Sequence, residues 1–288
     1  MDKDFEIVSN IKITHPQKKI LQAKKIDIVN YYNDIAKLML PFLDKRLLSV
    51  IRLHDGEKFF KKHPMASEDV ERFDTKKKKI LTQNKISKSN ASDDVYFFLK
   101  NKTQLLKQVQ LGSIEFHTWG CKCDNFSKPD LIVFDLDPDQ KLSLDKLRQG
   151  VLDLKEILDE LKLKPYLKTS GGKGYHVYAF FDGFSSWKSY ETFCKDVAVL
   201  MEQKYPDKYT TNIRKEARKG KIFVDFLRNK KGATCVAPYS LRARKNLPIS
   251  MPIKWEQLFE IKPDGVTINN YKTFLKVFSE KGKGYKFT

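Results

Sequence analysis

The sequence has no long hydrophobic run and little cysteine. No apolar segment approaches the ~20 residues that span a membrane, and the start, MDKDFEIVSN, lacks the basic and then apolar pattern of a secretory signal. Four cysteines in 288 residues do not make the dense disulfide framework of small secreted proteins. We therefore expect a soluble, intracellular protein with reduced thiols and no membrane contact.

Acidic residues are outnumbered. The chain has 36 Asp and Glu against 55 Lys and Arg, a formal net charge of +19. Such a surplus indicates a polyanionic partner, because Lys and Arg near phosphates displace condensed counterions. Arginine itself is rare, yet residues 214–244 hold most of it, and its forked donors suit phosphate oxygens. This window is predicted to face a ligand and contains Arg214, Arg218, Arg228, Arg242 and Arg244.

The remaining composition excludes a disordered chain. At 41% hydrophobic and 12% aromatic, the sequence can bury a proper core. At roughly 150 residues per domain, 288 residues make one large domain or two closely packed lobes. We expect two lobes.

Hydrophobic periodicity predicts mixed helices and strands. Helices are expected over 26–40, ending before Pro41, over 95–110, over 144–161 behind the cap Ser143, and over 187–205 behind Ser186. Strands are expected over 47–53, 113–119, 131–137, 165–167, 174–181 and 221–227, and an irregular or extended excursion over 75–93. From residue 131 onward, the order resembles a split βαβ module with one helical layer.

Three aspartates are candidates for a cation site. Asp135 and Asp137 share one face of the strand LIVFDLD, ~7 Å apart, although two solvated acids at a strand end would show the same pattern. Asp225 lies in KIFVDFL, where an isolated charge on an apolar strand is costly unless it is paired or holds a metal. Carboxylates suit hard divalent cations such as Mg²⁺ and Mn²⁺.

A glycine-rich turn, TSGGKGYHVY, lies between two expected strands. Its backbone N–H groups can approach an anion closely, and Ser170, Lys173 and His176 add side-chain donors. A simple hairpin loop, with His176 packed on a sheet, is the alternative interpretation.

Two further patterns have competing interpretations. His117, Cys121 and Cys123 have the spacing of zinc ligands but lack an evident fourth ligand, so ordinary loop thiols are favoured. Phe59 and Phe60 are consecutive aromatics in a basic setting. Since neighbouring side chains of a strand point to opposite faces, at least one is expected to be exposed and able to stack on a base.

Taken together, these motifs resemble the archaeo-eukaryotic primases, and most closely the polymerase domain of bacterial ligase D in non-homologous end joining or a stand-alone relative. Near the N-terminus, His15 departs from the Asn of that family, and the family does not explain the CKC at 121–123. The resemblance covers nearly the whole chain and rests on FDLDPD (134–139), SGGKGYHVY (170–178), GKIFVDFLRN (220–229), APYSLRAR (237–244), THPQKKI (14–20), KKIDIVNYY (24–32) and IRLHDGEKFFKKH (51–63).

The fold that this resemblance implies is α/β, the archaeo-eukaryotic primase fold. It consists of mixed or antiparallel sheets, with an RRM-like catalytic module packed on an N-terminal α/β lobe. Residues 1–288 would form a single primase-polymerase domain. Its DNA-end-binding lobe would cover about 1–120 and its catalytic lobe about 121–288.

The implied activity is DNA-dependent nucleotidyl transfer. Nucleotides, with ribonucleotides preferred, would be added to 3′ ends at gaps and double-strand breaks by a two-metal mechanism. Asp135, Asp137 and Asp225 would be the catalytic ligands of two Mg²⁺ or Mn²⁺ ions. The implied nucleotide-binding residues are Ser170, Lys173, His176 and Arg242 on the triphosphate, with Arg52 and His117 near the incoming nucleotide.

The implied partners are NTP or dNTP and DNA ends with gaps or 3′ overhangs and a 5′-phosphate. A monomer is expected, together with a Ku-like end-binding protein and a DNA ligase on the same or another chain, in a bacterial or archaeal cytoplasm at the nucleoid. The implied DNA-binding residues are Lys18 and Lys25 on the 5′-phosphate, with Phe59, Phe60, Arg218, Lys221 and Arg244.

Three other functions compete with this one. A replicative or repair primase of the same superfamily has the same motifs. A non-catalytic basic DNA-binding module would use the acids only as caps or ion pairs. A two-metal nuclease would also use three Asp, but it does not need a separate site that binds a triphosphate.

Overall fold

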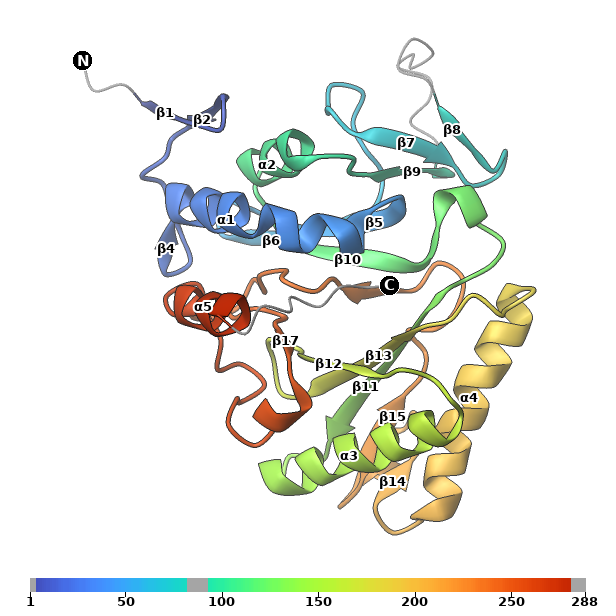
Figure 1. Cartoon of the computed structure of the whole chain (residues 1–288). Coiled ribbons are helices and arrows are strands. Elements are labelled where there is room, and N and C mark those ends of the chain that lie inside the picture. Colours follow the sequence, from blue (N-terminus) through green and yellow to red (C-terminus); the bar gives the residue numbers. More distant parts are fainter. Residues whose placement is uncertain (1–3, 82–92, 281–288) are drawn as a thin grey trace.

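The computed structural model describes residues 4–81 and 93–280, and it arranges them around two β-sheets, drawn one above the other in Figure 1. Helices α1 (Lys25–Leu43) and α2 (Lys102–Gln110) pack with the first sheet, and α3 (Leu144–Glu160) and α4 (Trp187–Lys204) pack with the second. This is the mixed α/β architecture with largely antiparallel sheets that the sequence predicts.

The first sheet has seven strands, and all of its pairings are antiparallel. Strand β5 (Arg46–His54), near the middle of the sheet, pairs on one side with β10 (Ser113–Lys122), which carries His117. In order, the strands are β16 (Thr234–Val236), β10 (Ser113–Lys122), β5 (Arg46–His54), β9 (Val95–Phe98), β7 (Glu71–Asp74) and β8 (Lys79–Leu81), with β6 (Glu57–Lys61) also paired to β5.

The second sheet has six strands and contains all three predicted aspartates. Only its pairing of β14 with β15 is parallel. The strands are, in order, β14 (Tyr209–Thr210), β15 (Ile222–Asp225), β11 (Leu131–Pro138), β13 (Tyr175–Phe180), β12 (Tyr166–Thr169) and β17 (Pro252–Ile253).

Smaller elements complete the fold. Two short hairpins precede α1, and one helix follows the sheets. They are β1 (Phe5–Val8) with β2 (Ile11–Thr14), β3 (Lys19–Ile20) with β4 (Ala23–Lys24), and α5 (Tyr271–Glu280).

The two sheets share one hydrophobic core. Between β15 and β17 of the second sheet, the chain crosses to place β16 beside β10 of the first. Buried tyrosines of α1 bond to both halves: Tyr31 donates to the carbonyl of Tyr239, and Tyr32 donates to the carbonyl of Ile114 and accepts from the N–H of Leu241. The junction between the sheets is therefore fixed by buried contacts.

Most predicted elements are confirmed. Ser143 and Ser186 cap α3 and α4 as expected, each accepting a hydrogen bond from the N–H three residues on. Helix α1, however, continues through Pro41 to Leu43. Pro41 lies in the last turn, where Phe42 and Leu43 are buried in the core, so their burial outweighs the lost hydrogen bond.

The helix predicted over 95–110 is wrong in its first half. Residues 95–98 form β9, because their β-branched and aromatic side chains pair between β5 and β7. The true N-cap is Asn101, whose side chain accepts from the N–H of Gln104. In the segment 75–93, expected to be irregular or extended, residues 79–81 form the paired strand β8, and residues 82–92 lie outside the described residues.

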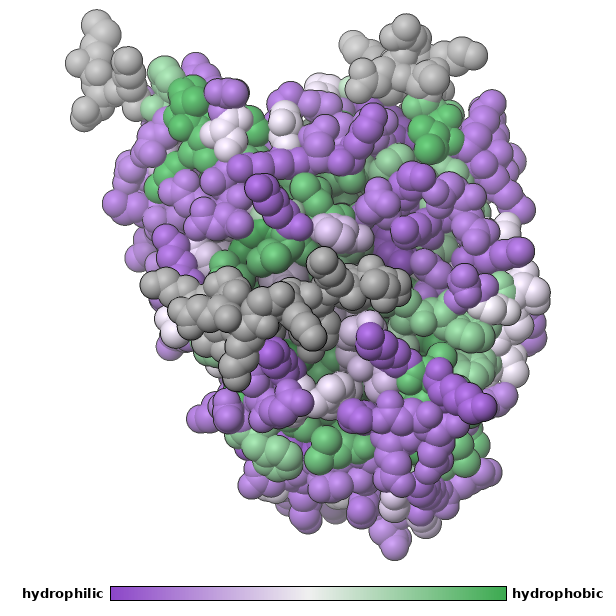
Figure 2. All heavy atoms as spheres, viewed as in Figure 1, coloured by the Kyte–Doolittle hydropathy of each residue, from purple (hydrophilic) through white to green (hydrophobic). Residues whose placement is uncertain are grey.

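The visible surface is mostly hydrophilic (Figure 2), as expected for a chain with 32% charged residues. Hydrophilic residues cover most of the face shown in Figure 2, with apolar residues between them. Within the described ranges, none of the helices combines the length and the apolar character needed to cross a lipid bilayer.

Candidate active site

A pocket of about 390 Å³ opens where the two sheets meet. Its walls come from β10, β11, the glycine turn, β13, β16 and the chain after β16. Most of the predicted nucleotide site is therefore brought together. The lining residues are His117, Asp135, Asp137, Ser170, Gly172, Lys173, Gly174, His176, Arg228, Thr234, Cys235, Val236, Arg242 and Arg244.

The three aspartates form one cluster beside this pocket. Strands β11 and β15 pair so that Asp135 lies opposite Asp225, and Asp137 shares the face of Asp135 two residues on. One carboxylate oxygen of each lies within 4.8 Å of the others. In the parts of the chain that the structure describes, no other three His, Cys, Asp or Glu side chains meet this way.

The charges of the cluster are poorly compensated. Burial and the neighbouring charges of Asp135 and Asp225 raise the pKa of Asp137 to about 6. Burial also raises the pKa of Asp225, although the charge of Arg228 acts in the opposite direction. Nε of Arg228 lies 3.3 Å from Oδ2 of Asp225. For Asp135, burial is outweighed by His176, which lowers its pKa to about 2. Since carboxylate oxygens are the donors that Mg²⁺ and Mn²⁺ prefer, a divalent cation fits this cluster and would relieve its repulsion.

Arginine side chains pack against the glycine turn. Gly171 has φ +64°, and a Cβ there would lie 2.5 Å from Cγ of Arg242. A Cβ on Gly172 would lie 2.9 Å from Nη1 of Arg244. The N–H groups of Gly172 and Gly174 donate to Oγ of Ser170 rather than pointing freely at an anion. The glycines therefore make room for arginine side chains, which the sequence interpretation did not foresee.

His176 is supported by a buried lysine that the sequence analysis missed. Nζ of Lys168 lies 2.6 Å from Nδ1 of His176 and donates to Oγ of Ser250 at 2.8 Å. Burial lowers the pKa of Lys168 to about 8. An ammonium group only donates, so Nδ1 accepts and the ring proton lies on Nε2, 3.4 Å from Oδ2 of Asp135. The sequence signal for Lys168 was a charged residue within the strand YLKT, because an isolated charge on a strand is costly unless it is paired, as argued for Asp225.

Two further residues line the pocket, one from the predicted arginine-rich window and one that the sequence did not indicate. Arg228, which the arginine-rich window predicted to face a ligand, lines the pocket and lies three residues after Asp225. Sγ of Cys235 lies 3.4 Å from Nδ1 of His176, and its neighbours His176 and Lys168 outweigh burial to lower its thiol pKa to about 7. Nothing in the sequence pattern of β16 marked this cysteine.

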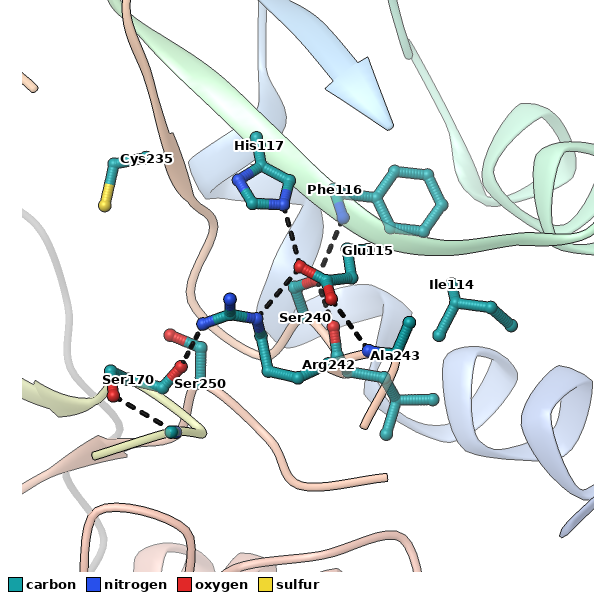
Figure 3. Close-up of polar contacts among 12 residues, drawn as sticks. Ile114, Glu115, Phe116, His117, Ser170, Cys235, Ser240, Arg242, Ala243 and Ser250 are labelled. Atoms are coloured by element: carbon teal, nitrogen blue, oxygen red, sulfur yellow. Dashed lines mark hydrogen bonds and ion pairs between the residues drawn. The ribbon is translucent and has the colours of Figure 1, made fainter. Parts of the chain in front are cut away.

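His117 and Arg242 meet across the pocket at Glu115, as Figure 3 shows. Glu115 and His117 lie on β10, whereas Arg242 lies beyond β16 and reaches the carbonyl of Ser170 with Nη1 at 2.5 Å. Two predicted nucleotide-binding residues therefore share one buried carboxylate, which no motif indicated.

Arg52 lies elsewhere. Its guanidinium is buried and donates to Ser113, Glu68 and Gln108, and it does not line the pocket of the described structure. Phe59 and Phe60 are both exposed on β6, at 48% and 55%, so the expectation of at least one exposed ring is confirmed. The Phe60 ring centroid lies 6.4 Å from that of His117, which places β6 at the edge of the site.

Lys18 and Lys25 lie close to each other and do not line the pocket. After burial, the charge of Lys18 is the main factor that lowers the pKa of Lys25. Nζ of Lys18 pairs with Oδ1 of Asp55 at 2.9 Å and is exposed, whereas Nζ of Lys25 donates to the carbonyl of Thr14 at 2.9 Å and is largely covered.

The remaining basic residues lie on two segments. Arg244 lines the pocket. Arg218 ends the short 3₁₀ helix Lys215–Arg218, packs over Phe223 and contributes positive charge near Asp137 and Asp225. Lys221 donates to the carbonyl of Pro206.

The zinc hypothesis finds no support among the described residues. Cys121 and Cys123 are buried with Trp119 and Phe126 in a small hydrophobic cluster, while His117 faces the pocket. Burial raises the thiol pKa of Cys121 to about 12 and that of Cys123 to about 11. Both cysteines therefore serve as small apolar side chains.

Comparison with known proteins agrees with this geometry. The family described as LigD, primase-polymerase domain, matches residues 24–282. The multifunctional non-homologous end joining protein LigD of Pseudomonas aeruginosa is 34% identical over 259 residues, covering 87% of this chain and 29% of that protein. The LigD of Mycolicibacterium smegmatis is 27% identical over 262 residues, covering 88% of this chain and 33% of its own length.

A solved structure shares the fold. The polymerase domain from Mycobacterium tuberculosis ligase D in complex with DNA superposes with a TM-score of 0.81 at 25% identity, covering 93% of this chain and 94% of that one. The chain thus spans about a third of the length of the curated relatives named above, and nearly all of this solved domain.

Proposed function

The chain belongs to the LigD primase-polymerase family and is a nucleotidyltransferase, and from this premise we propose that it adds nucleotides to 3′ ends of DNA at gaps and double-strand breaks during non-homologous end joining. Family membership excludes the non-catalytic DNA-binding module. The observation that carries the proposal is the cluster of Asp135, Asp137 and Asp225 beside a pocket lined by hydrogen-bond donors.

Two divalent cations, Mg²⁺ or Mn²⁺, would be held by the three aspartates. When bound, they supply activation of the primer 3′-hydroxyl and neutralisation of charge that develops on the transferred phosphate and the leaving pyrophosphate. Asp225 would lie beside the primer terminus, and Asp135 and Asp137 would face the incoming triphosphate. The raised pKa of Asp137 supports this assignment, because burial and the charges of Asp135 and Asp225 outweigh the positive charges of Arg218 and Arg228.

The opposite wall of the pocket would bind the triphosphate. Lys173 acts there as a point charge, Ser170 as a neutral polar group and Arg242 as a forked donor. His176 donates through Nε2, the nitrogen that Lys168 leaves protonated. Their position on the glycine turn, β13 and the chain after β16 supports a grip that spans both sheets.

DNA would approach along the basic and aromatic residues outside the pocket. Phe59 and Phe60 offer exposed rings on which bases can stack. The two neighbouring ammonium groups of Lys18 and Lys25 would receive a 5′-phosphate. The DNA in the related solved structure supports a DNA substrate for this chain. A Ku-like end-binding protein and a DNA ligase would complete the repair reaction on chromosomal DNA.

The proposed sugar preference is for ribonucleotides, one or a few per end. The test is single-turnover extension of a gapped duplex that carries a 5′-phosphate, with matched concentrations of NTP or dNTP and with Mg²⁺ or Mn²⁺. Nucleotide addition with release of pyrophosphate is expected, faster with NTP. A clear preference for dNTP would overturn the sugar assignment, and DNA cleavage without nucleotide addition would overturn the proposed reaction.

A further inference from the structure

We propose that Glu115 is a positioning residue for nucleotide transfer, whose carboxylate holds Arg242 and His117 in the orientation in which they meet the triphosphate. The inference rests on the proposed function of the pocket, and it adds a residue that touches neither substrate nor metal cluster.

Glu115 accepts three hydrogen bonds at one point between the two sheets (Figure 3). Its Oε2 accepts from Nε2 of His117 and from Nε of Arg242, both at 2.9 Å, and its Oε1 accepts from the N–H of Ala243 at 2.7 Å. The side chain is 4% exposed. Every donor that reaches it therefore comes from the protein, and two of the three belong to side chains that line the pocket.

This contact fixes the plane of the Arg242 guanidinium. Its Nε is held by Glu115 and its Nη1 by the carbonyl of Ser170 at 2.5 Å. A guanidinium is planar and rigid, so two held nitrogens determine where the third points. The hydrogen bonds found among the described residues leave Nη2 for a ligand. Gly171 keeps the approach open, because a Cβ there would collide with Cγ of Arg242.

The same carboxylate fixes the protonation of His117. A carboxylate only accepts, so Nε2 of His117 carries the proton that it donates to Glu115. Burial lowers the pKa of His117, so its ring is neutral and its Nδ1 is an acceptor. Loss of the carboxylate would free both the ring orientation and the position of its proton.

Glu115 stays charged throughout the neutral range. Burial works against its charged form, but His117 and Arg242 outweigh burial and lower its pKa to about 2. A buried ion pair adds little net stability, because desolvation offsets most of the attraction. A carboxylate at this point is therefore better explained by the geometry it imposes on its two neighbours than by stability alone.

The test is a double-mutant cycle of Glu115→Gln, Arg242→Ala and the combined variant, read by single-turnover extension of gapped DNA over a range of NTP concentrations. Gln keeps the size of the side chain but turns one acceptor into a donor. We expect Glu115→Gln to weaken apparent NTP affinity by about 10- to 100-fold, the range for a displaced binding group. DNA affinity should stay unchanged, and the effect should largely disappear in the Arg242→Ala background.

The matched control is Asp153→Asn. Asp153 is an equally buried carboxylate on α3 that accepts from Tyr209 and Gln149 and does not line the pocket. It should lose thermal stability while keeping its NTP affinity. If Glu115→Gln does not fold, Glu115→Asp, which keeps the charge but shortens its reach, is measured by the same assay and should show the same loss of NTP affinity.

The outcomes separate the two proposals. Wild-type protein that adds no nucleotide would refute the proposed function. Wild-type activity together with an unchanged NTP affinity in Glu115→Gln would refute only the positioning role. Effects of Glu115→Gln and Arg242→Ala that multiply independently, or a parallel loss of DNA affinity, would also refute it.

Discussion

Replacing Asp137 by Asn is expected to stabilise the metal-free protein at neutral pH. The pKa of Asp137 is raised from 3.8 to about 6, by burial and by the charges of Asp135 and Asp225. The folded protein therefore holds this proton more tightly than the unfolded chain does. The stability that results is complete at pH values below about 3.8 and is lost as the pH rises through about 6.

The magnitude follows from the size of the shift. A rise from 3.8 to about 6 is roughly 2 units, or about 3 kcal/mol at 1.36 kcal/mol per unit. Because the side chain is partly exposed, solvent screening reduces the expected effect to about 1–2 kcal/mol. Asp137→Asn removes this penalty above pH 7. Each kcal/mol corresponds to a rise in Tm of about 2–4 °C for a protein of this size class.

The assay is thermal unfolding in a chelator between pH 4.5 and 8. The difference between Asp137→Asn and wild type should grow across this range, and Mn²⁺ should then stabilise the wild type more than the variant. Asp139→Asn is the control: hydrogen bonds from the N–H groups of Lys141 and Gly220 lower the pKa of Asp139, so its removal should not stabilise the protein. An Asp137→Asn variant that is less stable than wild type at every pH would refute the reasoning.

Three further predictions concern DNA and nucleotide binding. Lys18→Ala combined with Lys25→Ala should abolish the roughly tenfold preference in Kd for gapped DNA that carries a 5′-phosphate, measured at fixed salt. A preference kept in full would show that the 5′-phosphate binds elsewhere. Phe59→Ala with Phe60→Ala should weaken single-strand binding by about 1–3 kcal/mol per stacked base with Tm unchanged, as measured by fluorescence anisotropy and thermal unfolding. Lys168→Met should lower Tm modestly, because Nδ1 of His176 and Oγ of Ser250 lose a buried donor, and should raise the NTP concentration for half-maximal extension; an unchanged NTP requirement would contradict its support of the histidine on the neighbouring strand.

Local patterns predicted the elements whose local and tertiary preferences agree. The strand around Asp135 and the helices behind Ser143 and Ser186 have strong periodicity and side-chain caps, so their bounds come within a residue or so of the prediction. The helix expected over 95–110 failed because Val95–Phe98 is a strand by pairing, and pairing partners lie far away in the chain.

The candidate site divides in the same way. The motifs predicted Asp135 and Asp225, and strand pairing then placed them opposite each other. Lys168 was an overlooked charge on a strand, whereas Glu115 was missed because it belongs to no motif. Its partner Arg242 lies 127 residues away in the sequence, a contact that only the folded chain reveals.

The most direct test of the account is the rate of nucleotide addition by Asp225→Ala beside wild type on the same gapped, 5′-phosphorylated DNA with NTP and Mn²⁺. If the three carboxylates hold the catalytic cations, the variant should lose at least about 10³-fold in rate, on the scale of removing a principal electrostatic contribution to catalysis. Its DNA affinity should equal or exceed that of wild type, because a negative charge near the phosphates is gone. Extension within a few-fold of the wild-type rate by a folded variant would contradict the account.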